Sequence, residues 1–227
     1  MSKLHAAIVA AAVCATVLFP SAAVADDLRD ALDLALSSRD TPKILSIMKD
    51  HKAPSDQAEL VRWLKDKVDS GQAPDQFASF LILTSFSEKN FDDVLFYLGY
   101  YRTLIVVDGA TCADPSSPGS LLESTIFIFG RLLKDQKFTL DQKQGAVDRA
   151  IKLEQATSPT RRRDPSLCGA GLTRYAKDLH VQLPTPAKPQ ESTGLYNDDA
   201  DWRQKRSAAL PNLKALLLST LGVPEKQ

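Results

Sequence analysis

Residues 90–107 read NFDDVLFYLGYYRTLIVV and carry the spacing of an α-helix over most of their length. Their apolar side chains recur three or four residues apart, as on one face of a helix. These side chains belong to Phe91, Val94, Leu95, Leu98, Tyr101 and Ile105. Asn90 is a residue type that caps helix N-termini, so the stretch predicts a long helix that begins just after it. Residues 104–107 are also the one β-like run of the sequence, too little to build a sheet.

The same periodicity extends along the chain in both directions from this stretch. Apolar residues with helical spacing occupy residues 28–36, 44–48, 58–68, 77–84, 121–133, 146–153 and 172–179. Gly71 predicts the end of one of these helices, because glycine adopts the left-handed conformation of a C-cap without strain. Thr139 and Gln142 have the spacing of a capping box, which predicts a helix start there. Together these signals predict an all-α fold.

Two segments interrupt the helical pattern, and a third separates a C-terminal part. Residues 107–119 and 158–171 are predicted to be irregular, the first because Asp-Gly, Asp-Pro and Pro-Gly pairs crowd it. Residues 183–197 hold three prolines, a glycine and mostly polar residues, which is typical of a linker. We therefore expect a helical domain over residues 26–182, made of antiparallel hairpins that form a bundle or a short solenoid. A C-terminal helical segment should follow over residues 198–222.

Residues 58–101 have a pattern of their own. They contain Trp63-Leu64, Gly71, Ala73-Pro74, Phe77, Leu81, Asp92-Asp93-Val94 and Phe96-Tyr97. This pattern resembles Sel1-like or tetratricopeptide-type helical repeats, in which one helix ends near a glycine and an antiparallel partner follows. It departs from those families at Ile82 and Thr84, where small residues are usual, and no second copy follows at a fixed period. The resemblance implies a helix-hairpin scaffold that binds other proteins; the alternative is a plain helical domain that uses the same turn.

The first 25 residues have the three-part layout of a secretory signal peptide. A short basic start precedes an apolar run over residues 6–19, and Ala23-Val24-Ala25 forms a small-x-small cleavage site. The apolar run holds about 14 residues, fewer than the roughly 20 of a membrane-spanning helix. We expect cleavage after Ala25 and an exported protein, periplasmic or secreted, with no membrane span after cleavage.

Cleavage would remove Cys14 and leave one pair of cysteines, Cys112 and Cys168. In an oxidising compartment an isolated pair is most simply a disulfide. A redox dithiol would be better supported by a C-x-x-C spacing, which the sequence lacks. A zinc site is not expected, because neither His51 nor His180 lies near a cysteine in the sequence. We therefore predict a structural disulfide, no metal and no cofactor.

The charge balance argues against one class of partner. The whole chain has 28 basic and 28 acidic residues, and removal of residues 1–25 takes away Lys3 alone, which leaves 27 − 28 = −1. A protein this close to neutrality has no overall field that would attract nucleic acid or an anionic membrane. We expect no nucleic-acid partner.

The densest charge run is a candidate binding surface. It consists of Arg161, Arg162 and Arg163. Guanidinium groups suit phosphates, lipid head groups and acidic partners, because their planar fork matches planar oxyanions. The alternative is a solvated loop whose charge is neutralised by Asp164 and neighbouring acids.

Three tyrosines of the central stretch, Tyr97, Tyr100 and Tyr101, are a second candidate binding surface. They either line a groove for a partner helix or peptide, or pack in the core between two helices, as clustered aromatic residues usually do. The acids Asp108 and Asp114 lie nearby in the irregular segment. They are turn-forming residue types and do not supply the six to eight oxygens of a calcium site.

No motif defines a catalytic activity. The sequence lacks a nucleophile elbow, an H-E-x-x-H motif, a P-loop and a G-x-G-x-x-G fingerprint. Two function classes remain. The first is a non-enzymatic interaction or scaffold module of the cell envelope, whose partner would be another envelope protein. The alternative is an envelope enzyme that acts on peptidoglycan or another glycan through an unidentified carboxylate; the lack of a complete catalytic constellation favours the first.

Overall fold

The computed structural model describes residues 22–162, 164–169 and 199–223, with the backbone alone at 22–26 and 199–203. Every regular element within these ranges is a helix, so the all-α prediction is confirmed. The chain divides into two compact units, residues 1–60 and 61–227, and each is described by itself. No helix in the described ranges is both long and apolar enough to span a bilayer.

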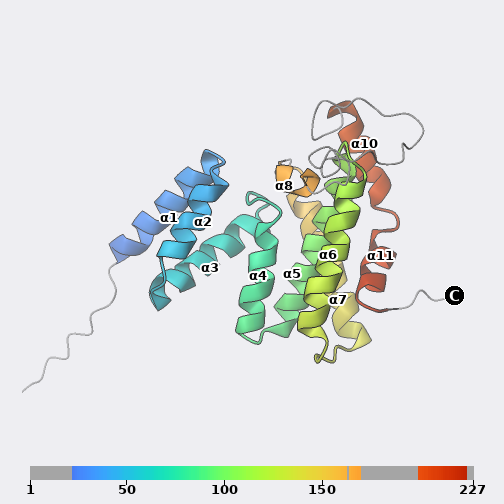
Figure 1. Ribbon diagram of the computed structural model, residues 1–227, viewed down its shortest axis with the longest axis horizontal. Helices are drawn as coiled ribbons and strands as arrows, with labels where there is room; N and C mark the ends of the chain where they lie inside the picture. Colours follow the sequence, from blue (N-terminus) through green and yellow to red (C-terminus); the bar gives the residue numbers. More distant parts are fainter. Residues whose placement is uncertain (1–21, 163, 170–198, 224–227) are drawn as a thin grey trace, which may run out of the picture. The chain divides into compact units, whose positions relative to one another are not determined.

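The smaller unit contains α1 (Ala22–Ser37), α2 (Thr41–Asp50) and the start of α3 (Pro54–Asp69). The larger unit contains the rest of α3 and all later elements (Figure 1). In chain order these are α4 (Phe77–Ser87), α5 (Phe91–Val107), the 3₁₀ helix η1 (Gly109–Thr111), α6 (Ser116–Leu133), α7 (Leu140–Thr157), α8 (Pro165–Cys168), α10 (Asp199–Ala209) and α11 (Leu213–Thr220).

A single type of turn builds one helical hairpin in each unit. Between α1 and α2, Arg39 has a left-handed φ of 58°, and the carboxylate of Asp40 then accepts a hydrogen bond of 2.9 Å from the backbone N–H three residues on. Between α4 and α5, Lys89 has the same φ of 58° and Asn90 caps the next helix over 3.3 Å. The left-handed residue ends one helix and the side-chain cap starts the next, so the chain reverses within three residues. The predicted cap at Asn90 is confirmed.

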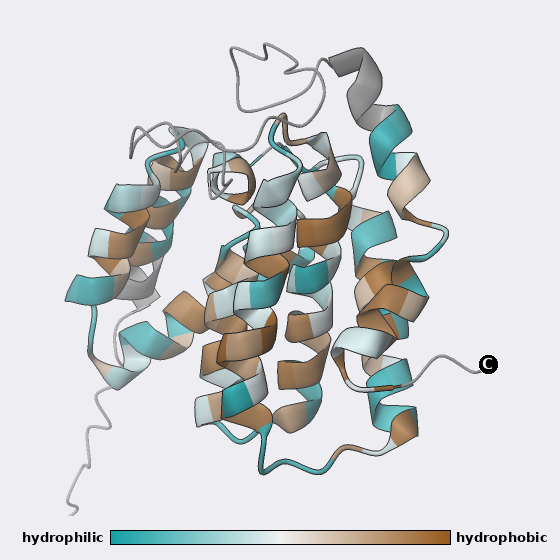
Figure 2. Ribbon diagram, turned by 45° about the vertical axis from the view of Figure 1, so that its right-hand side comes forward, coloured by the Kyte–Doolittle hydropathy of each residue, from teal (hydrophilic) through white to brown (hydrophobic). Residues whose placement is uncertain are grey.

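The helix α5 lies at the centre of the larger unit. All of its residues from 94 to 105 are buried, and it packs against α4, α6, α7, α10 and α11. A helix that is apolar on nearly all sides belongs in an interior, which is the arrangement that Figure 2 shows: hydrophobic residues gather where helices face one another and hydrophilic residues fill the turns. At Gly99 the missing side chain admits α7, because a Cβ there would lie 3.3 Å from the Cβ of Ala150.

Other signals at helix ends are also confirmed. Gly71 has a left-handed φ of 70° just beyond α3, and its N–H donates to the carbonyl of Val68. Thr139 and Gln142 form the reciprocal capping box that starts α7. These short-range signals determine where helices begin and end because the groups that satisfy the free backbone positions lie next to them in the sequence.

The β-like run at 104–107 forms the last turn of α5, where Val107 packs with Val147, Leu213 and Leu217. One expectation about the segment that follows is wrong. Residues 107–119 are not irregular throughout, since η1 occupies 109–111 and α6 already begins at Ser116. Proline is tolerated in the first turn of α6 because the first N–H groups of a helix have no partner within it.

The C-terminal segment is helical as predicted and belongs to the larger unit. Both α10 and α11 contact α5, and α11 also packs on α7. The second segment expected to be irregular, residues 158–171, contains the short helix α8. The linker at 183–197, a helix expected at 172–179 and residues 1–21 of the signal peptide lie outside the described residues. The cleavage predicted after Ala25 would fall inside α1.

The predicted disulfide between Cys112 and Cys168 is present. It joins the residue after η1 to the last residue of α8, with the two Cα atoms 5.2 Å apart. Ser117 of α6 donates a hydrogen bond of 3.0 Å from its hydroxyl to the carbonyl of Cys168. The bridge therefore fastens the segment after α7 to the segment that connects α5 with α6.

Reduction of this bridge should lower the free energy of unfolding by about 4 kcal/mol, because a loop of nearly 60 residues is no longer closed in the unfolded chain. We expect thermal unfolding of the oxidised protein to move to lower temperature in excess reductant, and the Cys112→Ser/Cys168→Ser variant to match the reduced protein. Non-reducing peptide mapping by mass spectrometry checks the linkage. Two free thiols in the natively produced protein, or equal melting temperatures, would contradict the prediction.

Candidate functional site

One arginine of the sequence-predicted charge run lies in the interior. Arg161 is 5% exposed, and its guanidinium binds the carboxylate of Asp108 through two hydrogen bonds. The Nε donates to Oδ2 over 2.9 Å and Nη2 donates to Oδ1 over 3.3 Å. Asp108 follows α5 directly and Arg161 follows α7 by four residues, so this ion pair links the ends of two neighbouring helices. Such a fork is the strongest geometry for a guanidinium and a carboxylate.

Two further side chains complete what we name the buried charge cluster, namely Asp108, Glu154, Arg161 and Arg206. Glu154 of α7 accepts at Oε1 from Arg161 Nη2 over 2.9 Å and from Arg206 Nη2 over 2.8 Å. Arg206 of α10 also brings its Nε within 3.2 Å of Asp108 Oδ1. Each carboxylate thus meets two guanidinium groups, and each guanidinium meets two carboxylates. Burial alone would lower the pKa of Arg161, but the hydrogen bonds and the charge of Asp108 raise it above its ordinary value.

The cluster also satisfies backbone and hydroxyl groups at the C-terminus of α7. Arg161 Nη1 donates to the carbonyl of Glu154 over 3.1 Å and to the hydroxyl of Thr157. Arg206 Nη1 donates to the carbonyl of Ser158 over 3.1 Å. The last carbonyls of a helix lack partners within it and carry its negative pole, so two cations there are electrostatically favourable.

Two buried carboxylates beside the cluster are less well compensated. The Oδ2 atoms of Asp75 and Asp164 accept no hydrogen bond from any described residue. Asp164 uses its other oxygen to cap α8, accepting from the N–H of Ser166 over 2.8 Å. The pKa of Asp75 is raised well above its ordinary value, first by burial and then by the charges of Asp108 and Asp164. The environment of Asp75 therefore favours the neutral acid.

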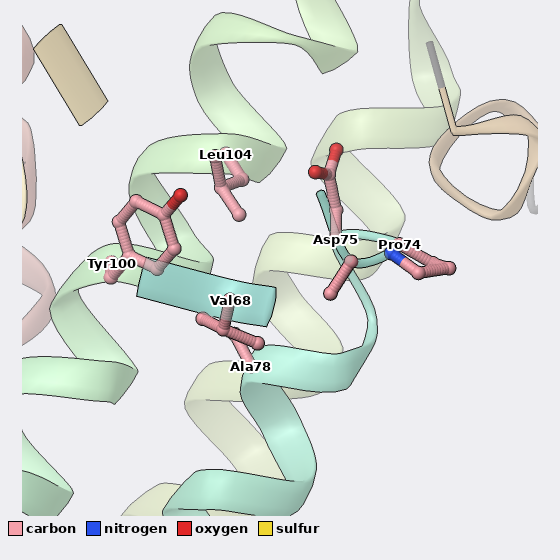
Figure 3. A pocket seen from close by; sticks show the side chains of 7 residues that line it. Val68, Pro74, Asp75, Ala78, Tyr100 and Leu104 are labelled. Atoms are coloured by element: carbon pink, nitrogen blue, oxygen red, sulfur yellow. The ribbon is translucent and has the colours of Figure 1, made fainter. Parts of the chain in front are cut away.

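Asp75 borders a small pocket between α3, α4 and α5. Its lining is mostly apolar and includes Val68, Ala78, Tyr100 and Leu104. Figure 3 shows the Asp75 carboxylate and the Tyr100 hydroxyl extending to the same side, away from Val68 and Ala78. The Tyr100 hydroxyl shares a hydrogen bond of 3.1 Å with the Thr157 hydroxyl, which itself contacts Arg161. The pocket is too tight to admit a substrate, so it isolates the acid from solvent.

The structure separates the members of the arginine run. Arg161 belongs to the buried charge cluster, Arg162 is exposed, and Arg163 lies outside the described residues. The expectation that the run is either a solvated loop or an exposed basic surface is thus wrong for Arg161. Its guanidinium forms buried ion pairs with Asp108 and Glu154.

The three tyrosines lie in the core and not on an open groove. Tyr97, Tyr100 and Tyr101 are all buried in α5. The hydroxyl of Tyr97 accepts from Lys65 Nζ over 2.9 Å and donates to Asp69 Oδ1 over 3.2 Å, so it joins α5 to α3. Burial raises the pKa of Tyr97 above its ordinary range and that of Tyr101 to about 12. Of the candidate surface, the described part therefore offers Arg162 alone to solvent.

The sequence pattern did not reveal the other members of the cluster. Asp108 looked like a turn-forming residue, and neither Glu154 nor Arg206 stood out. A signal for Glu154 did exist, because it lies four residues after the inward-facing Ala150 and hence on the buried face of α7. A carboxylate at an inward position needs a cation, and that requirement could have directed attention to arginines elsewhere. Nothing in the local sequence singles out Arg206 as its partner.

The arrangement is suited to holding segments together more than to acid–base chemistry. The carboxylates of the cluster are occupied by guanidinium groups, and Asp75 is closed off beside a small pocket. A general acid must reach the atom to which it gives a proton. In the described part of the chain, the pocket that Asp75 borders is too small for a substrate. Within the described residues, no three histidine, cysteine, aspartate or glutamate side chains are grouped as for a metal ion.

Comparison with known proteins assigns no relative. No protein-family model matches the chain, and no curated protein or solved structure is significantly similar to it. The chemistry of the described residues is therefore the basis for the functional argument.

Arg161→Met should lower the free energy of unfolding by about 3–5 kcal/mol, because Asp108 and Glu154 would remain buried with one guanidinium between them. The matched control is Arg162→Met, which removes the same charge from the adjacent, exposed position. We expect that control to leave the denaturation midpoint almost unchanged. Guanidinium chloride unfolding of both variants measures the difference; equal losses would show that the cluster does not carry the energy assigned to it.

Asp75 should make the protein less stable as pH rises. Its folded-state pKa lies above the ordinary value of 3.8, so the folded protein binds this proton more tightly than the unfolded chain does. Stability linked to this group is therefore fully present below the unfolded pKa and is lost as pH rises through the folded pKa. The Asp75→Asn variant stays neutral, so it should gain stability relative to the natural protein as pH rises from the ordinary value of 3.8 through the raised folded-state pKa. Asp135→Asn, at an exposed site, should show no such trend in urea unfolding, and parallel curves for D75N and the natural protein would refute the effect.

Proposed function

We propose that this protein is an exported, non-enzymatic interaction module of the cell envelope, which binds another envelope protein through α6. The observation that carries the proposal is a pair of adjacent, exposed large apolar residues. Phe127 is 64% exposed and Ile128 is 56% exposed, while the opposite side of α6 is buried at Thr125 and Phe129. Large apolar residues next to one another are a common core of protein interfaces.

The neighbouring arginine supports the same surface. The guanidinium carbon of Arg131 lies 5.5 Å from the ring centroid of Phe127, one helical turn earlier on α6. We name Phe127, Ile128 and Arg131 the α6 patch. Aromatic residues and arginine are enriched among the residues that dominate binding energy, and an arginine held over a ring is ready to contact a partner carboxylate. The partner should therefore present an apolar surface with an acidic side chain beside it.

Three further observations support export and an interaction role. The first 25 residues have the layout of a signal peptide, and a disulfide is typical of proteins in oxidising compartments. The resemblance of residues 58–101 to Sel1-like or tetratricopeptide-type repeats, families of protein-binding helical hairpins, points to the same class.

The alternative, an enzyme that acts on peptidoglycan or another glycan, has one observation in its favour. Asp75 has a raised pKa, as a catalytic general acid requires. A glycosidase pairs such an acid with a second carboxylate across a substrate-binding cleft. The small apolar pocket beside Asp75 argues against that role, so we rank the enzyme second.

The proposal predicts a crosslink from α6 in the cell envelope. A photoreactive amino acid at Phe127 should capture one defined partner in intact cells, because the partner would lie against the ring. The same residue at Gln155, an exposed polar position on α7, serves as the control and should capture much less. A photoreactive amino acid at Arg131 should form the crosslink in the natural sequence and lose it in the Phe127→Ser/Ile128→Ser variant. The free energy of unfolding should barely change in that variant. Equal products from positions 127 and 155 would refute the α6 patch.

A zymogram distinguishes the two function classes. The purified, oxidised protein should leave peptidoglycan embedded in a gel intact. Clearing by the natural protein that is lost in Asp75→Asn would overturn the non-enzymatic proposal and support the enzyme.

A further inference from the structure

The larger unit contains a second buried arginine whose surroundings differ from those of Arg161. Arg102 of α5 is 2% exposed. Its Nε donates to the hydroxyl of Thr125 over 3.2 Å and its Nη2 to the carbonyl of the same residue over 3.4 Å. Its Nη1 donates to the carbonyl and the hydroxyl of Thr220, over 3.1 and 3.0 Å. All of these acceptors are uncharged, and no described carboxylate forms an ion pair with Arg102.

A buried guanidinium without a counter-ion is energetically unfavourable. Charged groups in protein interiors are normally paired, because desolvation costs several kcal/mol for each ion. Burial alone lowers the pKa of Arg102 to about 10, whereas Asp108 more than offsets burial at Arg161. A guanidinium has five N–H groups, and the four contacts to threonines leave one hydrogen on Nη2 without a partner in the described structure. The described residues thus place a positive charge in the interior and pair no negative one with it.

Arg102 borders a cavity of about 180 Å³. Helices α5, α6, α7 and α11 contribute to its walls. Most of the wall is apolar, with Leu95, Leu98, Phe129 and Leu133 among the lining residues. The rim includes the exposed Gly130 and the half-buried Lys143, so the cavity opens to solvent. Among the described residues, the lining has two cations, Arg102 and Lys143, and no carboxylate.

We propose that this cavity binds a small apolar carboxylate, whose anionic group pairs with Arg102 and whose ring or short chain fills the space between α5 and α6. The positive charge of Arg102 defines the head group of the ligand, since an anion would supply the missing counter-ion. The walls define the tail, since apolar surface excludes a purely hydrophilic anion. The volume defines the size, because a cavity of roughly 150 Å³ accommodates benzene. A benzoate or a short-chain fatty acid meets all three requirements, and Lys143 at the rim would attract either one.

This inference is independent of the proposed function. The cavity lies between helices and uses none of the residues of the α6 patch, so a ligand here and a protein partner there succeed or fail separately. The bound anion would contact α5, α6 and, through Arg102, Thr220 at the end of α11. Occupation should therefore protect the contact between α11 and α5.

The unmodified protein tests the proposal first. The oxidised protein is titrated with sodium benzoate, sodium hexanoate and the neutral isostere benzamide at constant ionic strength, and backbone amide shifts are followed by NMR. We expect saturable shifts for at least one carboxylate at residues of α5, α6 and α11 that border the cavity. Benzamide should bind about tenfold more weakly or less, since it lacks the charge that Arg102 recognises. Equal affinities for benzoate and benzamide, shifts located elsewhere, or no saturation with millimolar ligand would overturn the proposal.

Variants then test the role of Arg102. Arg102→Gln should lose the preference for benzoate over benzamide, and Arg102→Lys should retain part of it because it keeps the charge without the fork. Lys134→Gln is the matched control, since it removes an exposed cation one residue after the lining Leu133 and should leave affinity unchanged. If circular dichroism shows that the Arg102 variants are unfolded, the titrations of the natural protein with benzoate, hexanoate and benzamide still test the proposal. A full preference in folded Arg102→Gln would overturn the assignment of the head group.

Discussion

The guanidinium of Arg161 pairs with the carboxylates of Asp108 and Glu154 in the interior of the larger unit, where all three side chains are buried. The three residues come from the end of α5, the last turn of α7 and the segment beyond it, and Arg206 adds α10 to the same set. Desolvation makes each charge unfavourable alone, so the four side chains stabilise the fold only together. Arg206 ties α10 to this cluster, and Arg161 also binds the carbonyl of Glu154 near the end of α7. The disulfide joins the segments that follow α5 and α7, which carry Asp108 and Arg161.

Desolvation also affects two other buried ionisable groups, Asp75 and Arg102, and each lacks a different kind of partner among the described residues. Asp75 lacks a hydrogen-bond donor at one oxygen, and its environment favours the neutral acid. Arg102 lacks an anion, yet an arginine does not give up its proton at physiological pH, so it is left as an uncompensated charge beside a cavity. A carboxyl group can respond to burial by binding a proton, whereas an arginine responds only by gaining a partner. For this reason burial of Asp75 affects the pH dependence of stability, whereas burial of Arg102 points to an anionic ligand.

The sequence predicted those features whose partners are close in the chain. Asn90, Gly71 and the pair Thr139 and Gln142 satisfy helix ends a few residues away, and the disulfide followed from counting cysteines. Local sequence signals do not distinguish Arg161 from Arg162. Which of these two adjacent residues faces inward depends on the course of the backbone after α7. Asp108 and Arg161 are 53 positions apart in the sequence, so no local pattern predicts their pairing. The cavity beside Arg102 could not be predicted from the sequence either, since residues of four helices form its walls.

Arg206 has one consequence for how the chain acquires its structure during synthesis. Translation proceeds from the N-terminus, so Asp108, Glu154 and Arg161 are all made before α10 exists. Until then two carboxylates share one guanidinium, and the nascent chain carries an excess negative charge at the place where α7 ends. The ion pairs of Asp108 and Glu154 with Arg206 therefore form only after α10 has been made. A fragment that stops before α10 would keep both carboxylates with Arg161 alone.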